Sequence, residues 1–158
     1  MKIKTTRFGE ISLAEEALID FPEGLVGFPQ LRRFAVFDGP EGSPFKWLQS
    51  ADEPGIAFVI CDPLLFKPDY RVRVTREEIA SIELEKIDDG LVATILVIPD
   101  DPQQMTANLL GPIVFNSAKR LGKQVVLMDP DLTTKYKVLR HARAAEGETP
   151  AEKRKKAK

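Results

Sequence analysis

Short apolar stretches alternate with turn-forming residues along most of the chain. Gly, Pro, Asp and Asn interrupt the apolar positions every eight to twelve residues, which is the spacing of short strands and not of long helices. About eight to ten strands are expected from this pattern. The clearest candidates cover residues 2–6, 11–13, 33–37, 45–50, 56–61, 70–75, 91–98, 113–115 and 124–128.

Hydrophobic periodicity separates the strands that should be buried from those that should be half-exposed. Residues 56–61 are apolar on both faces, and residues 91–98 are all apolar or Thr, so both stretches should lie between other elements. The second is expected to be a central strand. Residues 70–75 alternate, with Tyr70 on the side of the valines and the arginines opposite, which is typical of a half-exposed strand.

Two hairpins follow from the spacing of these stretches. Residues 2–6 and 11–13 flank a turn that contains Gly9. Residues 113–115 and 124–128 are joined by a polar stretch that contains Gly122. Both separations suit antiparallel neighbours.

A single helix start is convincing. Thr75 can cap the first turn, and Glu78 stands three residues later, as in a capping box. Ile79 and Ile82 then fall on one face, which predicts about two turns of helix. We therefore expect a mostly all-β domain, a compact antiparallel β-barrel-like or sandwich fold with one short helix.

The domain should occupy residues 1–140, and residues 141–158 read as a basic tail. The tail is rich in Ala, Glu, Lys and Arg and has no large apolar residue to bury, so we expect it to be disordered or a frayed helix. Charge divides in the same way. Residues 1–139 hold 16 Lys and Arg against 21 Asp and Glu, a net charge of −5, and residues 140–158 hold 7 against 3, a net charge of +4.

Composition places the chain among ordinary globular proteins. Hydrophobic residues make up 43% and charged residues 30%, and no apolar run approaches the roughly 20 residues of a membrane span. The N-terminus lacks the apolar core of a signal peptide, and the single cysteine, Cys61, cannot form an internal disulfide. A cytoplasmic location is the expectation.

Candidate catalytic groups are few. The only histidine, His141, falls at the edge of the tail, which disfavours triads built on a folded core. Cys61 follows a run of apolar residues and should be a buried core residue. Acidic pairs such as Asp100 and Asp101 could serve a hydrolase or a hard cation, yet adjacent carboxylates in turns are usually solvated. We expect no enzyme, no cofactor and no metal.

Aromatic, proline and amide side chains recur beside the turns, and they form the candidate site. Large rigid side chains next to amides suit a protein interface, because they bury much area and lose little rotamer freedom. The competing interpretation is that they are core aromatics and turn amides. The positions are Phe45, Trp47, Gln49, Phe66, Pro68, Tyr70, Asn108, Pro112 and Asn116.

Four strings in this order resemble a known family. They are FPEGLVGF (residues 21–28), PFKWLQS (44–50), DP followed by FKPDY (62–63 and 66–70), and TANL followed by PIVFN (106–109 and 112–116). Each is weak alone, and together they span most of residues 1–140. They are similar to the signature of the flagellar assembly factor FliW family. The third string adds Asp69 to the candidate interface.

The resemblance implies a compact β-barrel-like domain that acts by holding other proteins. Members of the family bind flagellin, the filament subunit, and the translational regulator CsrA. Once flagellin is exported, the released factor captures CsrA and relieves its repression of flagellin messenger RNA. The resemblance also implies a role as a flagellin chaperone. The resemblance implies no direct nucleic-acid, membrane or small-molecule partner.

Two other functions stay open at this point. A nucleic-acid-binding barrel could use the basic tail, although no aromatic residues are interleaved there for base stacking. A hydrolase could use an acidic pair, in which case Asp100→Asn should abolish activity. Deleting residues 142–158 should weaken an RNA binder and leave a protein antagonist unchanged.

Overall fold

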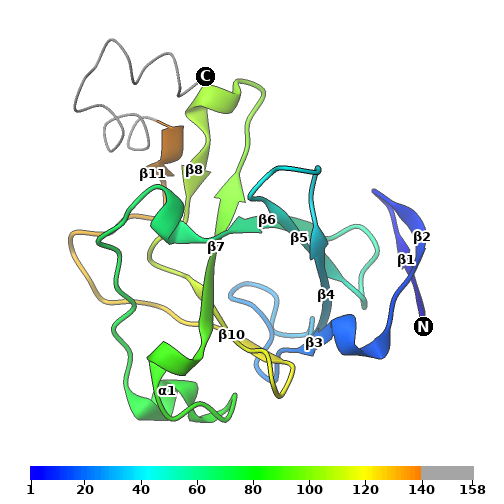
Figure 1. The fold of residues 1–158 in the computed structure, drawn as a ribbon, viewed down its shortest axis with the longest axis horizontal. Coiled ribbons are helices and arrows are strands. Elements are labelled where there is room, and N and C mark those ends of the chain that lie inside the picture. Colours follow the sequence, from blue (N-terminus) through cyan, green and yellow to red (C-terminus); the bar gives the residue numbers. More distant parts are fainter. Residues whose placement is uncertain (140–158) are drawn as a thin grey trace.

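The computed structural model describes residues 1–139 of the 158 in the sequence. Strands dominate it, and its helical segments are short (Figure 1). The strands are β1 (Lys2–Thr5), β2 (Gly9–Ser12), β3 (Leu18–Asp20), β4 (Arg33–Asp38), β5 (Lys46–Ser50), β6 (Ala57–Cys61), β7 (Leu91–Val97), β8 (Thr106–Ala107), β9 (Ile113–Asn116), β10 (Leu121–Gln124) and β11 (Tyr136–Lys137). The helical segments are α1 (Arg76–Ala80) and the 3-10 turns η1 (Glu15–Ala17), η2 (Pro63–Leu65), η3 (Ile87–Asp89) and η4 (Pro102–Gln104). The expected tail, residues 141–158, lies outside the described part.

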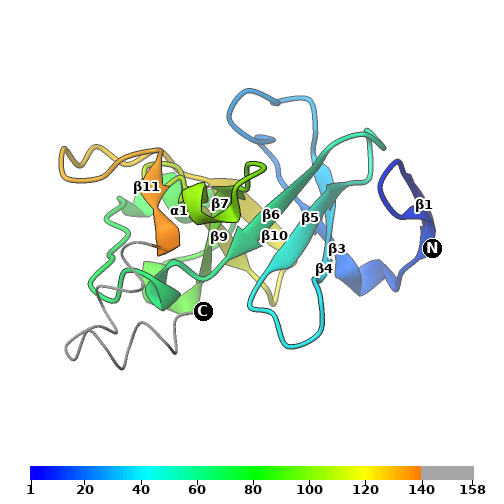
Figure 2. The same cartoon turned by 90° about the horizontal axis from the view of Figure 1, so that it is seen from above.

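Seven strands close into a barrel. β3, β4, β5, β6 and β7 are antiparallel neighbours in that order, β7 also pairs with β9, and β9 pairs with β10. The seam is a single parallel bridge that joins Leu121 of β10 to Asp20 of β3. β8 and β11 extend the sheet beyond β7, and Figure 2 shows β11 on the side of the barrel away from β1. The expected mostly β fold with one short helix is confirmed, and it is a barrel and not a sandwich.

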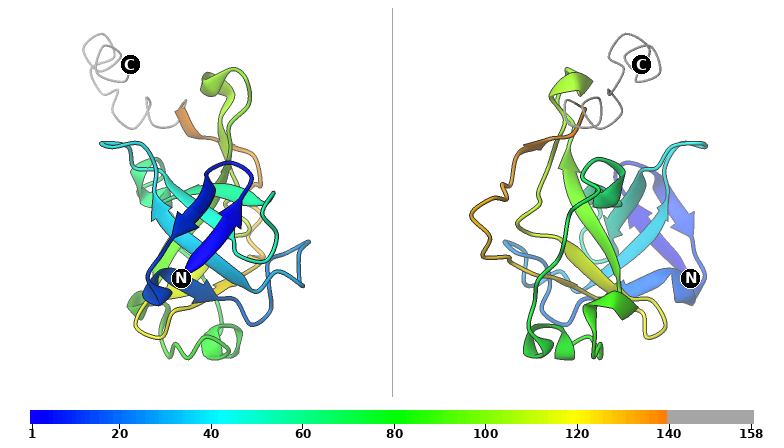
Figure 3. Two further views of the ribbon diagram at one scale, coloured as in Figure 1. Left: turned by 90° about the vertical axis from the view of Figure 1, so that its right-hand side faces the viewer. Right: turned by 60° about the vertical axis from the view of Figure 1, so that its left-hand side comes forward.

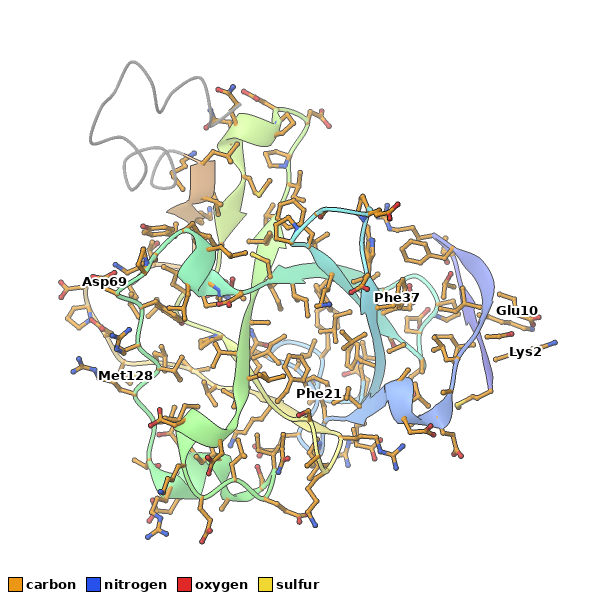
Figure 4. All side chains as sticks on the ribbon, viewed as in Figure 1. Lys2, Glu10, Phe21, Phe37, Asp69 and Met128 are labelled. Carbon is orange, nitrogen blue, oxygen red and sulfur yellow. The ribbon has the colours of Figure 1, made fainter. Side chains whose placement is uncertain are left out.

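One apolar cluster fills the barrel. Phe21 is fully buried, and its ring meets Phe34 edge to face at 5.2 Å and Phe115 at 6.0 Å between centroids. Figure 4 shows Phe21 in the middle of the molecule. Because alternate strand residues face opposite sides of a sheet, Ala93 and Ile95 of β7 point into this cluster.

A second apolar cluster lies on the outer face of β7. Leu96 of β7 and Val114 of β9 belong to it, and the segment between β6 and β7 covers it. The helix α1 closes one end of this cover with the capping box expected from sequence. Thr75 Oγ1 accepts from the Glu78 backbone nitrogen at 3.2 Å, and the Thr75 nitrogen donates to Glu78 Oε1 at 2.9 Å.

The prediction of a strand at residues 70–75 is wrong. Val72 and Val74 are half-buried against the outer cluster and Arg71 and Arg73 are exposed, so the alternation is real. No strand pairs with this segment among residues 1–139. Alternation reports which side of an extended chain faces a core, and it does not require a neighbour within hydrogen-bonding distance.

The second hairpin is confirmed with a shifted second strand. β10 begins at Leu121, inside the stretch read as a loop, because Gly122 lets the backbone lie directly on the ring of Phe21. Beyond β10 burial alternates along the chain: Val125 and Leu127 are buried, and Val126 and Met128 are exposed. The nitrogens of Val125 and Leu127 donate to carbonyls of residues 112 and 110 at 2.9 and 2.8 Å.

The first hairpin forms a separate two-stranded ribbon of β1 and β2, as expected. Phe8, in its turn, contacts Phe37 and Trp47 edge to face, each with 5.1 Å between centroids. The Thr6 nitrogen donates to the Pro54 carbonyl at 2.9 Å. These contacts hold the ribbon against β4 and β5, and the left view of Figure 3 shows it in front of the barrel.

Candidate protein-binding site

Gln49, one of the expected interface residues, is fully buried in β5. Its amide nitrogen lies within hydrogen-bonding distance of three carbonyls, those of Ser50 at 3.0 Å, Pro54 at 3.2 Å and Ile56 at 3.1 Å. Within the described residues its Oε1 accepts no hydrogen bond. The side chain therefore holds together the turn between β5 and β6.

Tyr70 and Asn116 are also internal. The Tyr70 hydroxyl donates to the Leu109 carbonyl at 2.6 Å, and burial, with a smaller contribution from Asp129, raises the pKa of this phenol. The Asn116 amide donates to the Ile82 carbonyl at 2.9 Å, and Asn116 is 8% exposed. Both side chains fasten the cover of the outer cluster to the barrel.

Three more of the expected positions are part of the fold itself: Asn108, Pro112 and Phe66. Asn108 Oδ1 accepts from the nitrogens of Leu110 at 3.1 Å and Gly111 at 2.9 Å, which shapes the turn before β9. Pro112 and Phe66 are buried.

Phe45 and Trp47 are half-buried. Phe45 packs against the outer cluster, and Trp47 lies under the ribbon, where the Arg7 guanidinium sits 4.9 Å from its ring centroid. Pro68 and Asp69 are exposed. The Lys67 ammonium donates to Asp69 at 3.1 Å, and this bond with its charge holds the pKa of Asp69 below its usual range.

The expected positions do not form one continuous surface. Asp69 lies at one margin of the molecule in Figure 4, and Phe37, the strand neighbour of Trp47, lies towards the other. Buried positions such as Gln49 and Asn116 offer little surface to a partner in this conformation, whereas Tyr70 is buried but lines a pocket. Among the ten expected positions, the ones that are exposed or half-buried are Phe45, Trp47, Pro68, Asp69 and Asn108.

An apolar pocket of about 790 Å³ has one of the expected positions, Tyr70, in its wall. Its walls come from inside the barrel and from the covering segment. Ile60, Ala93 and Phe115 of the barrel cluster line it, so the pocket reaches the barrel interior. Tyr70 and Val72 line it from the covering segment. Pockets of about 300–1,000 Å³ with apolar walls are typical binding sites.

Exposed leucines border the pocket. Leu64 is 49% exposed and Leu91 is 62% exposed, and both line it. Leu65, next to Leu64, is 58% exposed. The sequence contained a sign of this border, because two leucines directly follow the turn-forming pair Asp62-Pro63. Two adjacent leucines in a short turn are seldom both buried.

Charged groups stand among the lining residues. Lys46 is paired with Asp38 at 2.5 Å, which leaves Asp62, Asp88 and Arg71 as the other charges. The site is therefore apolar inside and slightly acidic at its edge.

Cys61 also lines the pocket, and it is 5% exposed. Burial, assisted by the nearby Asp62 carboxylate, raises the pKa of its thiol to about 12. The thiol therefore stays protonated near neutral pH and is a poor nucleophile. The expectation of a buried structural cysteine is confirmed.

No group of three or more His, Cys, Asp or Glu in residues 1–139 is arranged to hold a metal ion. Within the same residues, no helix is long and apolar enough to cross a bilayer.

A closed seven-stranded barrel with one short helix places the chain among small, mostly β domains. The model of one family in this class, described as FliW protein, matches residues 2–138. The chain belongs to the FliW family of flagellar assembly factors, which are not enzymes.

Relatives with the name flagellar assembly factor FliW cover nearly the whole described chain. The one from Natranaerobius thermophilus is 39% identical over 137 residues, which is 86% of this chain and 91% of the relative. The one from Bdellovibrio bacteriovorus is 42% identical over 132 residues, 84% of this chain and 75% of the relative. A crystal structure of a flagellar assembly factor FliW superimposes with a TM-score of 0.80 at 32% identity, over 87% of this chain and 96% of that one.

Proposed function

We propose that this flagellar assembly factor binds flagellin in the cytoplasm and, once flagellin has been exported, binds CsrA and stops it from repressing flagellin messenger RNA. Family membership over residues 2–138 is the observation that supports the proposal most directly, because it includes the barrel, the pocket and the covering segment. The exposed leucines around the pocket support a role in holding other proteins.

The charge of the domain supports the second partner. A regulator that binds RNA must present positive charge to phosphates. Residues 1–139 carry a net charge of −5, so they attract such a surface and disfavour RNA beside it.

The test is a binding competition between purified proteins. Calorimetry should show that the full chain binds flagellin and CsrA separately. Flagellin added to a preformed complex with CsrA should release CsrA, which size-exclusion chromatography detects. Failure to bind either protein would refute the proposal.

A truncated chain without residues 142–158 serves as a control. The truncated chain should keep both partners, because the proposal assigns no role to the tail. If the full chain instead binds RNA by itself and the truncation removes that binding, the tail acts as a nucleic-acid site and the proposed antagonism is wrong.

A further inference from the structure

We infer that the pocket at the open end of the barrel receives the apolar side chains of one flagellin segment, with a basic side chain of that segment at the acidic edge. This assignment rests on the proposed function and adds to it the site and the chemistry of its occupant.

Within residues 1–139 the pocket stays open on one side. Residues that belong to the barrel cluster, Ile60 and Phe115 among them, form its floor, and Leu91 stands at its border with 62% of its surface exposed. Removing apolar surface from water is favourable, so a partner that covers this floor and border gains affinity.

The occupant is larger than a small molecule. Leu65, beside the lining residue Leu64, extends the apolar surface past the pocket, and it is 58% exposed. Small-molecule sites also fix orientation with polar groups that converge inside the cavity. Here the charged lining residues Asp62, Asp88 and Arg71 are exposed, which suits a protein segment that crosses the opening.

The charge at the edge of the pocket indicates which residues should flank the apolar side chains of the bound segment. Lys46 is neutralised by Asp38, and the two carboxylates of Asp62 and Asp88 outnumber the single guanidinium of Arg71. A Lys or Arg next to the apolar side chains of the segment therefore complements the edge.

Apolar walls favour flagellin over CsrA at this pocket. A subunit that polymerises buries apolar surface against other copies in the filament, and before assembly that surface needs a cover. An RNA-binding surface is cationic and suits the acidic exterior of the domain instead.

β7 supplies a matched pair of variants for the test. Leu91 and Val97 begin and end this strand, both are 62% exposed, and only Leu91 lines the pocket. Leu91→Asp should weaken flagellin binding at least tenfold in calorimetry, and Val97→Asp should leave it within twofold of wild type. Leu64→Asp should repeat the loss from a different element. Circular dichroism melting checks that all three variants are folded.

Each other result overturns the assignment. Normal flagellin binding by Leu91→Asp would show that flagellin does not use the pocket. An equal loss of binding in Val97→Asp would show that the added charge acts without regard to the pocket. If the pocket variants lose CsrA binding and keep flagellin binding, the pocket is a binding site for CsrA and not for flagellin. If the wild-type chain binds no flagellin, the proposed function itself fails, and that failure is visible before any variant is made.

Methyl resonances of the wild-type chain give a readout that needs no substitution. Unlabelled flagellin should shift or broaden the methyl signals of Ile19, Ile60 and Leu91, which line the pocket, and leave that of Val97 in place. Binding of flagellin with no change at the three pocket residues would overturn the assignment.

Discussion

Gln49 and Asn116 each place a side-chain amide among backbone carbonyls inside the fold. Sequence marks both as polar residues near turns, and this is compatible with an interface or with a role in the interior. The choice depends on groups far along the chain, because Asn116 meets the carbonyl of Ile82. Local sequence cannot supply that contact, so the structural role of these amides is a result of the tertiary fold.

The first prediction concerns Asn116. Asn116→Ala leaves the buried carbonyl of Ile82 without its donor, so the free energy of unfolding should fall by about 1–3 kcal/mol. Urea denaturation measures the change. The adjacent exposed residue offers the control Ser117→Ala, which should stay within about 0.5 kcal/mol of wild type.

Asp52 supports a prediction about pH. Burial alone would raise its pKa, but the nitrogens of Arg32 and Arg33 at 3.1 and 3.2 Å and the Arg33 guanidinium together hold the pKa below its usual value. A carboxyl with a lowered folded pKa stabilises the fold above its unfolded pKa, and this contribution is lost as pH falls through the folded value.

Asp52→Asn should therefore lower the free energy of unfolding at pH 7 by about 1 kcal/mol, since solvent screens the partly exposed group. The difference from wild type should disappear as the pH falls below 4 towards 2. Urea denaturation at several pH values measures it. The neighbouring variant Glu53→Gln removes one charge without these bonds, and an equal loss there would contradict the assignment.

Strands were predictable where the pattern was long, and less so where packing decided. The run at residues 91–98 became β7 almost unchanged. The start of β10 was placed too late because the polar stretch that contains Gly122 appeared to be a loop, whereas the missing side chain of Gly122 makes room for Phe21. Propensity describes the residue alone, and the need for a glycine came from an aromatic ring a hundred positions away.

Gly122 supports a prediction about the packing of β10 against the barrel core. A Cβ there would lie 2.6 Å from Cζ of Phe21, a ring that is fully buried, so Gly122→Ala should destabilise the barrel by about 1–3 kcal/mol. Thermal melting measures the loss. Gly55→Ala is the control, because its Cβ would meet only Thr6 Oγ1 at 3.8 Å, and it should melt close to wild type.

Barrel closure determines what the whole molecule can bind. The pocket joins residues from Ile19 to Ser117, and only the closed sheet brings them around one opening. Sequence predicted the fold class, and its resemblance to a family predicted what kind of protein this is. It could not predict the pocket, because the pocket has no local pattern. Its exposed leucines were the one visible trace.

The net charge of the domain supports a prediction about the molecule as a whole. If residues 1–139, with a net charge of −5, attract CsrA over a distance, the association rate should fall steeply as salt rises from about 50 to 500 mM. Dissociation should change less. Stopped-flow fluorescence separates the two rates, and an association rate that is constant across this range would exclude electrostatic steering.

The seam between β3 and β10 has a consequence for biosynthesis. Leu121 must find Asp20, and β9 must find β7, before the barrel is closed. Nearly all of the domain has therefore to leave the ribosome before its central aromatic rings are shielded from water. Pairings so distant in sequence slow folding. We expect the nascent chain to remain open, and to need protection from aggregation, until translation has passed the final strands.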